Sequence, residues 1–380
     1  MIKSISVLVF IVAARFYGLF VVLPILSVYA KDFSGANALI IGLIVGAYAI
    51  AQIIFQLPFG RLSDKIGRKK ALALGFVVFL AGSLICAISS DVYTMILGRF
   101  IQGAGAVGAV ASAFIADLSA AHQRGRAMAA MGVGIGLSFS AAMISGPLLA
   151  SSFGISALFY LCAIISLLCL ALLTLLPSNS AQSHTKQAPS IATLLACKDL
   201  RLLSLSNLAQ KALLNAVFVA MPLVLVASLG YEKDKLWHIY AISTLFGFVA
   251  MGLSGALGDK RGLGREILLL GVGLFALCFV LFGVADFSSS KVLFFIAAVL
   301  FFVAFNMHEP MLQSCASKVA SFEHRGAALG LSTACGYAGS FIGSIIAPLV
   351  LAYFGFGVLV GALALLCMLW FIALRKLNKI

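Results

Sequence analysis

One carboxyl group, that of Glu309, lies inside a run of apolar residues long enough to cross a membrane and away from the ends of that run. An ionised carboxylate is costly in such surroundings, so an acid placed there can bind a proton and release it when its environment changes. Asn306 and His308 lie within one helical turn, and Pro310 leaves a carbonyl of the preceding turn without its usual donor. The pattern predicts either a proton-carrying acid or a structural carboxylate that is permanently paired with a cation.

Three cations, Arg15, Lys211 and Arg99, also lie inside apolar runs. Deep cations in a helical bundle generally mark a hydrated cavity. They predict either a site for an anionic substrate or partners that tune a protonatable acid. For Arg99, hydrogen bonds to neighbouring carbonyl groups are an equally good explanation. His308 fits a packed polar residue better than a metal ligand, because no second histidine stands at metal-binding spacing.

A dense cluster of charge, Gly60–Leu72, stands between two apolar runs, and it contains five cations and the single carboxylate of Asp64. A weaker copy appears in the second half at Gly255–Gly262. A carboxylate in a short turn can accept N–H bonds from the start of a helix, where the helix dipole favours negative charge. We expect Gly60–Leu72 to be a structured loop of this kind; the alternative is a solvated, positively charged loop.

The composition explains why these charges need elements that cross a membrane. The chain has 380 residues, of which 63% are hydrophobic and 10% charged, and its mean hydropathy is +1.14. Soluble domains are nearer a quarter charged, and continuous apolar runs exclude the alternating pattern of a β-barrel. The net charge of +14 does not indicate nucleic-acid binding, because the basic residues gather in alternate loops. We predict an all-α integral membrane protein.

Twelve apolar segments follow one another along the chain, each near the length of about 20 residues that crosses a bilayer. We predict spans at residues 5–30, 38–59, 71–89, 93–116, 127–150, 156–177, 202–228, 236–256, 267–286, 292–315, 327–353 and 357–374. With Gly60–Leu72 on the cytoplasmic side, the basic loop residues on the other side are Lys31, Lys233, Lys235 and Lys291. This bias predicts that both termini are cytoplasmic.

The two halves of the chain carry the same features in the same order. The matching pairs are Phe20–Pro24 with Phe218–Pro222, Gly60 with Gly255, Asp64 with Asp259, and Pro147 with Pro348. A polar stretch at 177–190 separates the spans into six and six. We predict two pseudo-symmetric six-helix bundles at residues 1–177 and 201–380, and a cytoplasmic linker at 178–200 with room for a short amphipathic helix. Two such repeats with a site between them are typical of secondary transporters.

With these features the chain resembles the major facilitator superfamily over essentially its whole length. Gly60–Leu72 matches the family's signature between spans 2 and 3, and Leu97–Gly103 resembles its span-4 arginine motif. Ser145–Pro147 is similar to the proline motif of the drug–proton antiporters, although Ala150–Ser151 stand where that family has a glycine pair.

A second set of residues is most similar to the YajR-like efflux branch of that family. The set consists of Phe301–Asn306, Glu309, Arg15 and Asp117. Members of that branch can carry an additional C-terminal soluble domain, which we do not expect here.

The resemblance implies a major facilitator fold with a conformational latch. In the family, the aspartate that corresponds to Asp64 binds the start of span 11, here Gly326, when the cytoplasmic side is closed. Arg68 would pair with Asp117, and the motif's glycines are Gly60 and Gly67. The helix-packing or hinge positions that we expect are Gly146, Pro147, Pro310 and Pro348.

Several other classes of site are excluded by spacing. Gly103–Gly108 fits the pattern GxGxxG, but it lies inside an apolar span rather than between a strand and a helix, so we expect close helix packing and no nucleotide. The eight cysteines show no CxxC pairing, so neither a disulfide framework nor a zinc site is indicated. We expect no cofactor and no metal.

We expect an inner-membrane secondary transporter that works as a monomer in the lipid bilayer. It would export small, amphipathic compounds in exchange for protons, by rocking of its two halves about a central cavity. The rival is a uniporter or proton-coupled carrier for a sugar, amino acid or organic anion, since three deep cations accompany one deep acid. A membrane enzyme or non-transporting receptor is the third class, but no nucleophile–base pair or soluble catalytic domain supports it.

Overall fold

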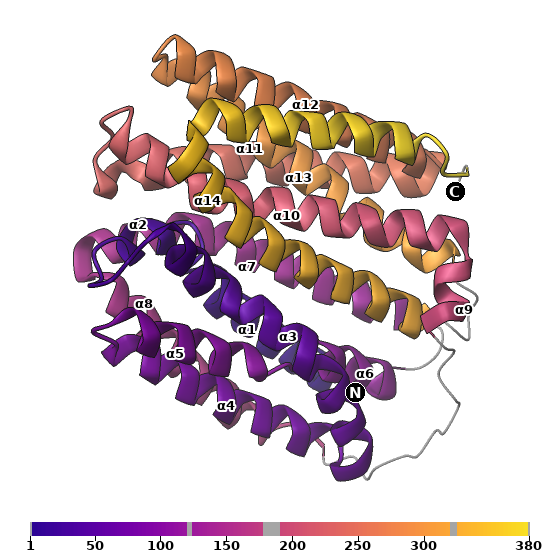
Figure 1. Cartoon of the computed structure of the whole chain (residues 1–380). Helices are drawn as coiled ribbons and strands as arrows, with labels where there is room; N and C mark the ends of the chain where they lie inside the picture. Colours follow the sequence, from indigo (N-terminus) through magenta and orange to yellow (C-terminus); the bar gives the residue numbers. More distant parts are fainter. Residues whose placement is uncertain (1, 120–123, 178–190, 320–324, 379–380) are drawn as a thin grey trace. The chain divides into compact units, whose positions relative to one another are not determined.

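The computed structural model describes residues 2–119, 124–177, 191–319 and 325–378, and these residues are mostly helical (Figure 1). The chain divides into two compact units, Met1–Thr185 (unit 1) and Lys186–Ile380 (unit 2). The helices of unit 1 are α1 (Ile2–Phe20), α2 (Leu26–Ala30), α3 (Ala38–Ile66), α4 (Arg68–Ile88), α5 (Val92–Ala104), α6 (Gly108–Leu118), α7 (Arg124–Phe153) and α8 (Ile155–Leu173). Those of unit 2 are α9 (Ile191–Ala196), α10 (Lys198–Ala227), a 3-10 turn (Lys233–Lys235), α11 (Leu236–Arg261), α12 (Gly264–Phe287), α13 (Lys291–Val319) and α14 (Arg325–Leu374).

Ten helices of the described residues are long and apolar enough to cross a membrane. All twelve predicted spans fall on helices, but two spans that we predicted as continuous are broken. The first span stops after Phe20 and resumes at Leu26 beyond Pro24, which has no N–H to donate. The fourth is broken between α5 and α6, where the Ala106 amide bonds to the Ala104 carbonyl in a γ-turn.

The last two predicted spans lie in α14, which changes direction at Gly355, where φ is +84°. Pro147, Pro310 and Pro348 lie inside α7, α13 and α14, and each helix continues through its proline. Their role as hinges stays a prediction.

The charged stretch Gly60–Leu72 is not the loop that we predicted. α3 continues to Ile66 and α4 begins at Arg68, so Gly67 alone separates them. At Gly67 φ is +92° and ψ is 149°, a combination that is essentially restricted to glycine. In the copy in unit 2, α11 likewise runs through the charged residues to Arg261 and ends at a glycine with positive φ, Gly262 at +63°, and Leu263 then precedes α12. The prediction was wrong because it took a high density of charge as the sign of a loop. A helix can extend beyond the membrane and keep its charged residues in water.

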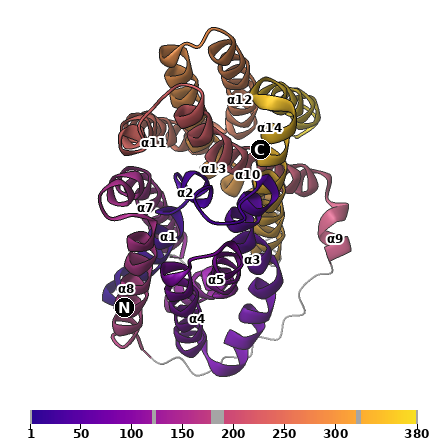
Figure 2. The same cartoon turned by 60° about the vertical axis from the view of Figure 1, so that its left-hand side comes forward.

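Each unit has its own packing. In unit 1, α1 packs against α7, α4 against α8, and α3 against α5. In unit 2, α10 packs against α14, and α13 packs between α11 and α12. Figures 1 and 2 both show α4 beside α5 and α12 beside α13. A Cβ at Gly146 would strike the carbonyl of Val21, so this glycine lets α7 approach the break in the first span closely.

The predicted linker, residues 178–200, ends earlier in the structure than in the prediction. Residues 178–190 lie outside the described residues, whereas α9 forms within the stretch where we expected a short helix. α10 already begins at Lys198, before the predicted bundle boundary at residue 201. Leu194 of α9 and Leu200 of α10 are buried against Ala328 near the start of α14. α9 is therefore anchored within unit 2 by apolar contacts.

Candidate functional site

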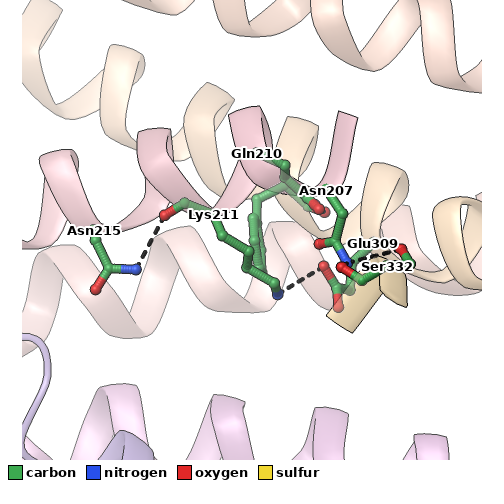
Figure 3. A network of polar contacts seen from close by, with 7 residues as sticks. Asn207, Gln210, Lys211, Asn215, Glu309 and Ser332 are labelled. Atoms are coloured by element: carbon green, nitrogen blue, oxygen red, sulfur yellow. Dashed lines mark hydrogen bonds and ion pairs between the residues drawn. The ribbon is translucent and has the colours of Figure 1, made fainter. Parts of the chain in front are cut away.

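The deep acid of unit 2 is paired with the deep cation of the same unit. The Lys211 ammonium on α10 lies 2.8 Å from Oε2 of Glu309 on α13 (Figure 3). About a quarter of the lysine side chain and a third of the glutamate are exposed, at 23% and 31%. The two residues therefore form an ion pair that water can reach, inside two helices that are apolar enough to cross a membrane.

The lysine is held from several sides. Its ammonium lies 5.0 Å from the centre of the Phe305 ring, a cation–π distance. Its backbone carbonyl accepts a bond of 3.0 Å from Nδ2 of Asn215, one turn later on α10. Because the backbone and the ammonium are both held, Lys211 has a defined side-chain direction along α10, which Figure 3 shows.

One turn before Lys211, Asn207 joins α10 to α14. Its Nδ2 donates to the carbonyl and to the hydroxyl of Ser332, at 2.8 and 3.1 Å. A Cβ at Gly336 would come within 3.1 Å of the asparagine side chain, so the glycine leaves room for this approach. Gln210 makes a longer bond of 3.4 Å to the Phe305 carbonyl.

Asn306 and His308, which the sequence placed beside Glu309, face other neighbours. Asn306 donates to the Phe302 carbonyl of its own helix at 2.9 Å. His308 is fully buried with ring centres 5.0 Å from Trp370 and 6.2 Å from Phe275. Neither of its nitrogens has a partner among the described residues. The structure thus brings Lys211 and Glu309 together and packs His308 into the apolar core of unit 2.

The two deep arginines of unit 1 are buried without a carboxylate partner in the described part of the chain. The Arg15 guanidinium lies 3.6 Å from the centre of the Phe79 ring and donates to the Gly105 carbonyl at 3.3 Å. This carbonyl belongs to the break between α5 and α6. A desolvated cation–π contact contributes about 2 kcal/mol or more. Arg15 therefore stabilises the broken span, where we had expected a hydrated cavity.

Arg99 makes hydrogen bonds of the kind that the sequence left open as the alternative, whereas its Nη2 has no partner among the described residues. It donates to the Ile44 carbonyl at 3.4 Å and to Oε1 of Gln102 at 2.5 Å. Gln102 in turn donates to the hydroxyl of Ser83 at 3.0 Å. The Arg99 guanidinium also lies 5.4 Å from the centre of the Tyr48 ring. The result is a fully buried polar network that ties α5 to α3 and α4.

The charged junction of α3 and α4 contains the ion pair that the family resemblance implied. Arg68 Nε lies 3.0 Å from Oδ2 of Asp117 on α6, and its Nη1 lies 2.5 Å from Oδ1 of Asp64. The same Nη1 donates to the hydroxyl of Ser63. Arg68 therefore fixes the end of α3 to the end of α6. The Asp64 side chain is 55% exposed.

Gly60 and Gly326, the other two glycines expected in the latch, lie in helices, and a Cβ at either would meet no atom within 4 Å. Unit 1 itself therefore gives no steric reason for a glycine at 60. Asp64 and Gly326 belong to different units, and the contact between them stays a prediction.

Comparison with known proteins decides the family. The Major Facilitator Superfamily matches residues 8–344. The chain belongs to this superfamily. It is a multi-span membrane transporter, and not an enzyme.

Three further likenesses agree with that membership. The inner membrane transport protein YajR of Escherichia coli is 33% identical over 334 residues, covering 87% of this chain and 73% of YajR. The quinolone resistance protein NorA of Staphylococcus aureus is 36% identical over 127 residues, about a third of each chain. The crystal structure of a D-xylose-proton symporter superimposes with a TM-score of 0.84 at 18% identity, covering 99% of this chain and 98% of the symporter. A likeness at so low an identity concerns the fold.

Sequence reasoning missed the neutral polar residues of this transporter. Tyr48, Gln102, Asn207 and Gln210 are all buried and contact or neighbour a deep charge. The sequence could have indicated the amide residues among them, because a buried amide in an apolar span is costly and needs a partner. The described residues include no cluster of three or more metal-binding side chains.

Proposed function

We propose that the transporter exports small, amphipathic compounds from the cytoplasm across the inner membrane in exchange for protons. The observation that carries the proposal is the water-accessible Lys211–Glu309 pair, 2.8 Å apart in an apolar unit. Resemblance to a quinolone resistance protein and to an inner membrane transport protein supports the direction and the membrane.

Glu309 is the proposed proton site and Lys211 its counter-ion. Protonation of the carboxylate removes the negative charge that holds Lys211, so the ion pair weakens. A ligand shifts a conformational equilibrium only by its different affinities for the two states. A proton that favours one arrangement of α10 and α13 can therefore drive the exchange.

The available energy is sufficient for drug export. One proton that moves down a potential of 100 mV releases about 2.3 kcal/mol. At about 1.4 kcal/mol per tenfold change, this supports roughly 50-fold accumulation of an uncharged substrate. The structure gives the rival anion carrier less support than the sequence did. Lys211 has a carboxylate partner, and Arg15 and Arg99 are held by aromatic rings and carbonyl groups.

The conformational latch belongs to the same proposal. Asp64 would bind the backbone N–H groups at the start of α14, next to Gly326, when the cytoplasmic side is closed. Its exposed carboxylate and its position beside Arg68 support this role. The two halves would then rock about a central site in a monomeric protein.

The experiment is a measurement of proton release when substrate binds. Detergent-solubilised protein in weak buffer is mixed with each member of a panel of amphipathic drugs, and a pH indicator records the released protons. Antiport predicts release from the wild type and none from Glu309→Gln. Binding of a drug to the wild type without release of protons would favour the uniporter.

A further inference from the structure

Lys211 needs a hydrogen-bond acceptor in both protonation states of Glu309, a requirement that rests on the proposed function. In the structure, that acceptor is Oε2 of Glu309 at 2.8 Å. When a proton binds this carboxylate, its negative charge is lost, and Glu309 can offer the ammonium only a neutral carbonyl oxygen. A partly buried ammonium without a counter-ion is unfavourable, so a further acceptor within reach of Lys211 would stabilise the protonated state.

Two buried amide oxygens near Lys211 are unused. Oδ1 of Asn207 and Oε1 of Gln210 have no hydrogen-bond partner among the described residues. Asn207 is 2% exposed and Gln210 is fully buried, so bulk water does not satisfy them. A buried amide oxygen without a partner is unfavourable, and a free acceptor one helical turn from an ammonium therefore calls for an explanation.

The geometry favours Asn207 of these two. Residues four apart on a helix lie on the same face, so Asn207 is a neighbour of Lys211 along α10. Helical side chains tilt toward the start of their helix, and Figure 3 shows Lys211 pointing along α10 in the direction of Asn207 and away from Asn215. Gln210 is the preceding residue and faces the Phe305 carbonyl, to which it donates.

Asn207 is also held in place by its other end. Its Nδ2 bonds to the carbonyl and hydroxyl of Ser332, so its amide plane is fixed. Its Oδ1 faces Gly336 of α14, which has no side chain, and has no hydrogen-bond partner among the described residues. A fixed amide with one used and one unused end is a preorganised acceptor.

We propose that Asn207 Oδ1 is the alternative acceptor for Lys211, so that the ammonium moves from Glu309 to Asn207 when Glu309 is protonated. The proton forms an O–H bond on the carboxylate, and one N–H···O hydrogen bond is exchanged for another. Lys211 keeps its own proton throughout. Asn207 acts here as a positioning residue, which stabilises the protonated state of the transporter.

Few other charged groups face this site. His308 on α13 packs against Phe275 and Trp370. α14 has no acidic or basic residue between Gly326 and Leu374, and its titratable side chains there are Cys335, Tyr337, Tyr353 and Cys367. The charged residues of α11 and α12 lie at the helix ends. Glu309 and Lys211 are thus the charges that the exchange concerns.

The test follows the protonation of Glu309 without any substrate. Infrared difference spectra of the purified full-length protein are recorded between pH 4 and 9, and the protonated-carboxyl band of Glu309 is identified by its loss in Glu309→Gln. Asn207→Leu removes the alternative acceptor, so the midpoint of this band should move to lower pH. We expect a shift of about one to two pH units, the worth of a hydrogen bond to a charged group.

The direction in which the midpoint of the Glu309 band moves distinguishes an acceptor role of Asn207 from a merely structural role. An apolar side chain that only dried the site would disfavour the ionised carboxylate and move the midpoint to higher pH. Asn207→Ser is the second variant, in case Asn207→Leu does not fold. Its side chain is too short to reach Lys211, so it should shift the midpoint in the same direction as Asn207→Leu. Ser332→Ala, which removes one anchor of Asn207 but not its oxygen, should leave the midpoint nearly unchanged.

Gln210→Leu is the matched control on the same helix. A downward shift there, with none in the Asn207 variants, would assign the acceptor to Gln210 and overturn the proposal. An unchanged or raised midpoint in both Asn207 variants would also overturn it. If the wild type shows no Glu309 band at any pH, the proposed proton site itself fails, and the exchange that depends on it fails too.

Discussion

Separation of the Lys211–Glu309 pair should cost stability, and restoring charge balance should recover part of it. Lys211→Met leaves a carboxylate without its cation, and Glu309→Gln leaves an ammonium without its anion. Exposed ion pairs contribute about 0–1 kcal/mol, whereas removal of one partner from a fully buried pair costs about 3–5 kcal/mol. With 23% and 31% of the two side chains exposed, we expect a loss of about 1–2 kcal/mol for each single variant.

Thermal unfolding in detergent measures this loss. For units of this size, about 1 kcal/mol corresponds to roughly 2–4 °C in the unfolding midpoint, so each single variant should unfold about 2–8 °C below the wild type. Lys211→Met combined with Glu309→Gln should lose clearly less than the sum, because neither charge is then left alone. Lys376→Met removes an exposed cation and should leave the midpoint unchanged. Additive losses in the double variant would refute the coupling that the geometry implies.

Three further predictions concern unit 1. Asp64→Asn should weaken transport strongly while the thermal midpoint changes little, because Arg68 keeps Asp117 as its partner; full transport by this variant would exclude the latch. Gly67→Ala should destabilise by about 1–3 kcal/mol, since φ is +92° there, whereas Gly60→Ala inside α3 should be neutral or stabilising, and thermal midpoints compare the two. Hydrogen bonds from the Thr94 hydroxyl, the Thr94 amide and the Tyr93 amide hold the pKa of Asp91 below its usual value. Asp91→Ala should therefore lower the midpoint at neutral pH, by an amount that shrinks as the pH falls below about 4 and the wild-type cap is protonated; a gap that stayed constant down to pH 2 would contradict this origin.

Much of the fold followed from the sequence, because membrane spans are set by runs of apolar residues and by the distribution of Lys and Arg. The predictions were wrong where charged residues continue a helix and where the backbone breaks inside an apolar span. Gly60–Leu72 reads as a loop by composition, yet both helices extend into it and only Gly67 leaves the helix. The break between α5 and α6 has no signal in apolar periodicity, and the Arg15 bond to the Gly105 carbonyl at this break joins residues 90 positions apart in the chain.

The candidate site could be predicted only in part. Lys211 and Glu309 were each identified as deep charges, but 98 residues separate them, and nothing in either span indicates that α10 and α13 lie side by side. Arg15 was expected at a hydrated cavity, since the cost of burying a cation is usually met by water or an acid. Phe79 and a backbone carbonyl contact the guanidinium instead, and its Nε and Nη1 have no partner among the described residues. Aromatic residues are so common in membrane spans that no sequence pattern singles out Phe79.

The central claim is that proton entry through Glu309 drives export, and transport in proteoliposomes under an imposed pH gradient tests it most directly. A panel of amphipathic drugs is screened for accumulation by the wild type, with Glu309→Gln as the variant. We predict accumulation that requires the pH gradient in the wild type, and loss of this dependence in Glu309→Gln with drug binding retained. Gradient-driven accumulation of the same size in Glu309→Gln would contradict the account.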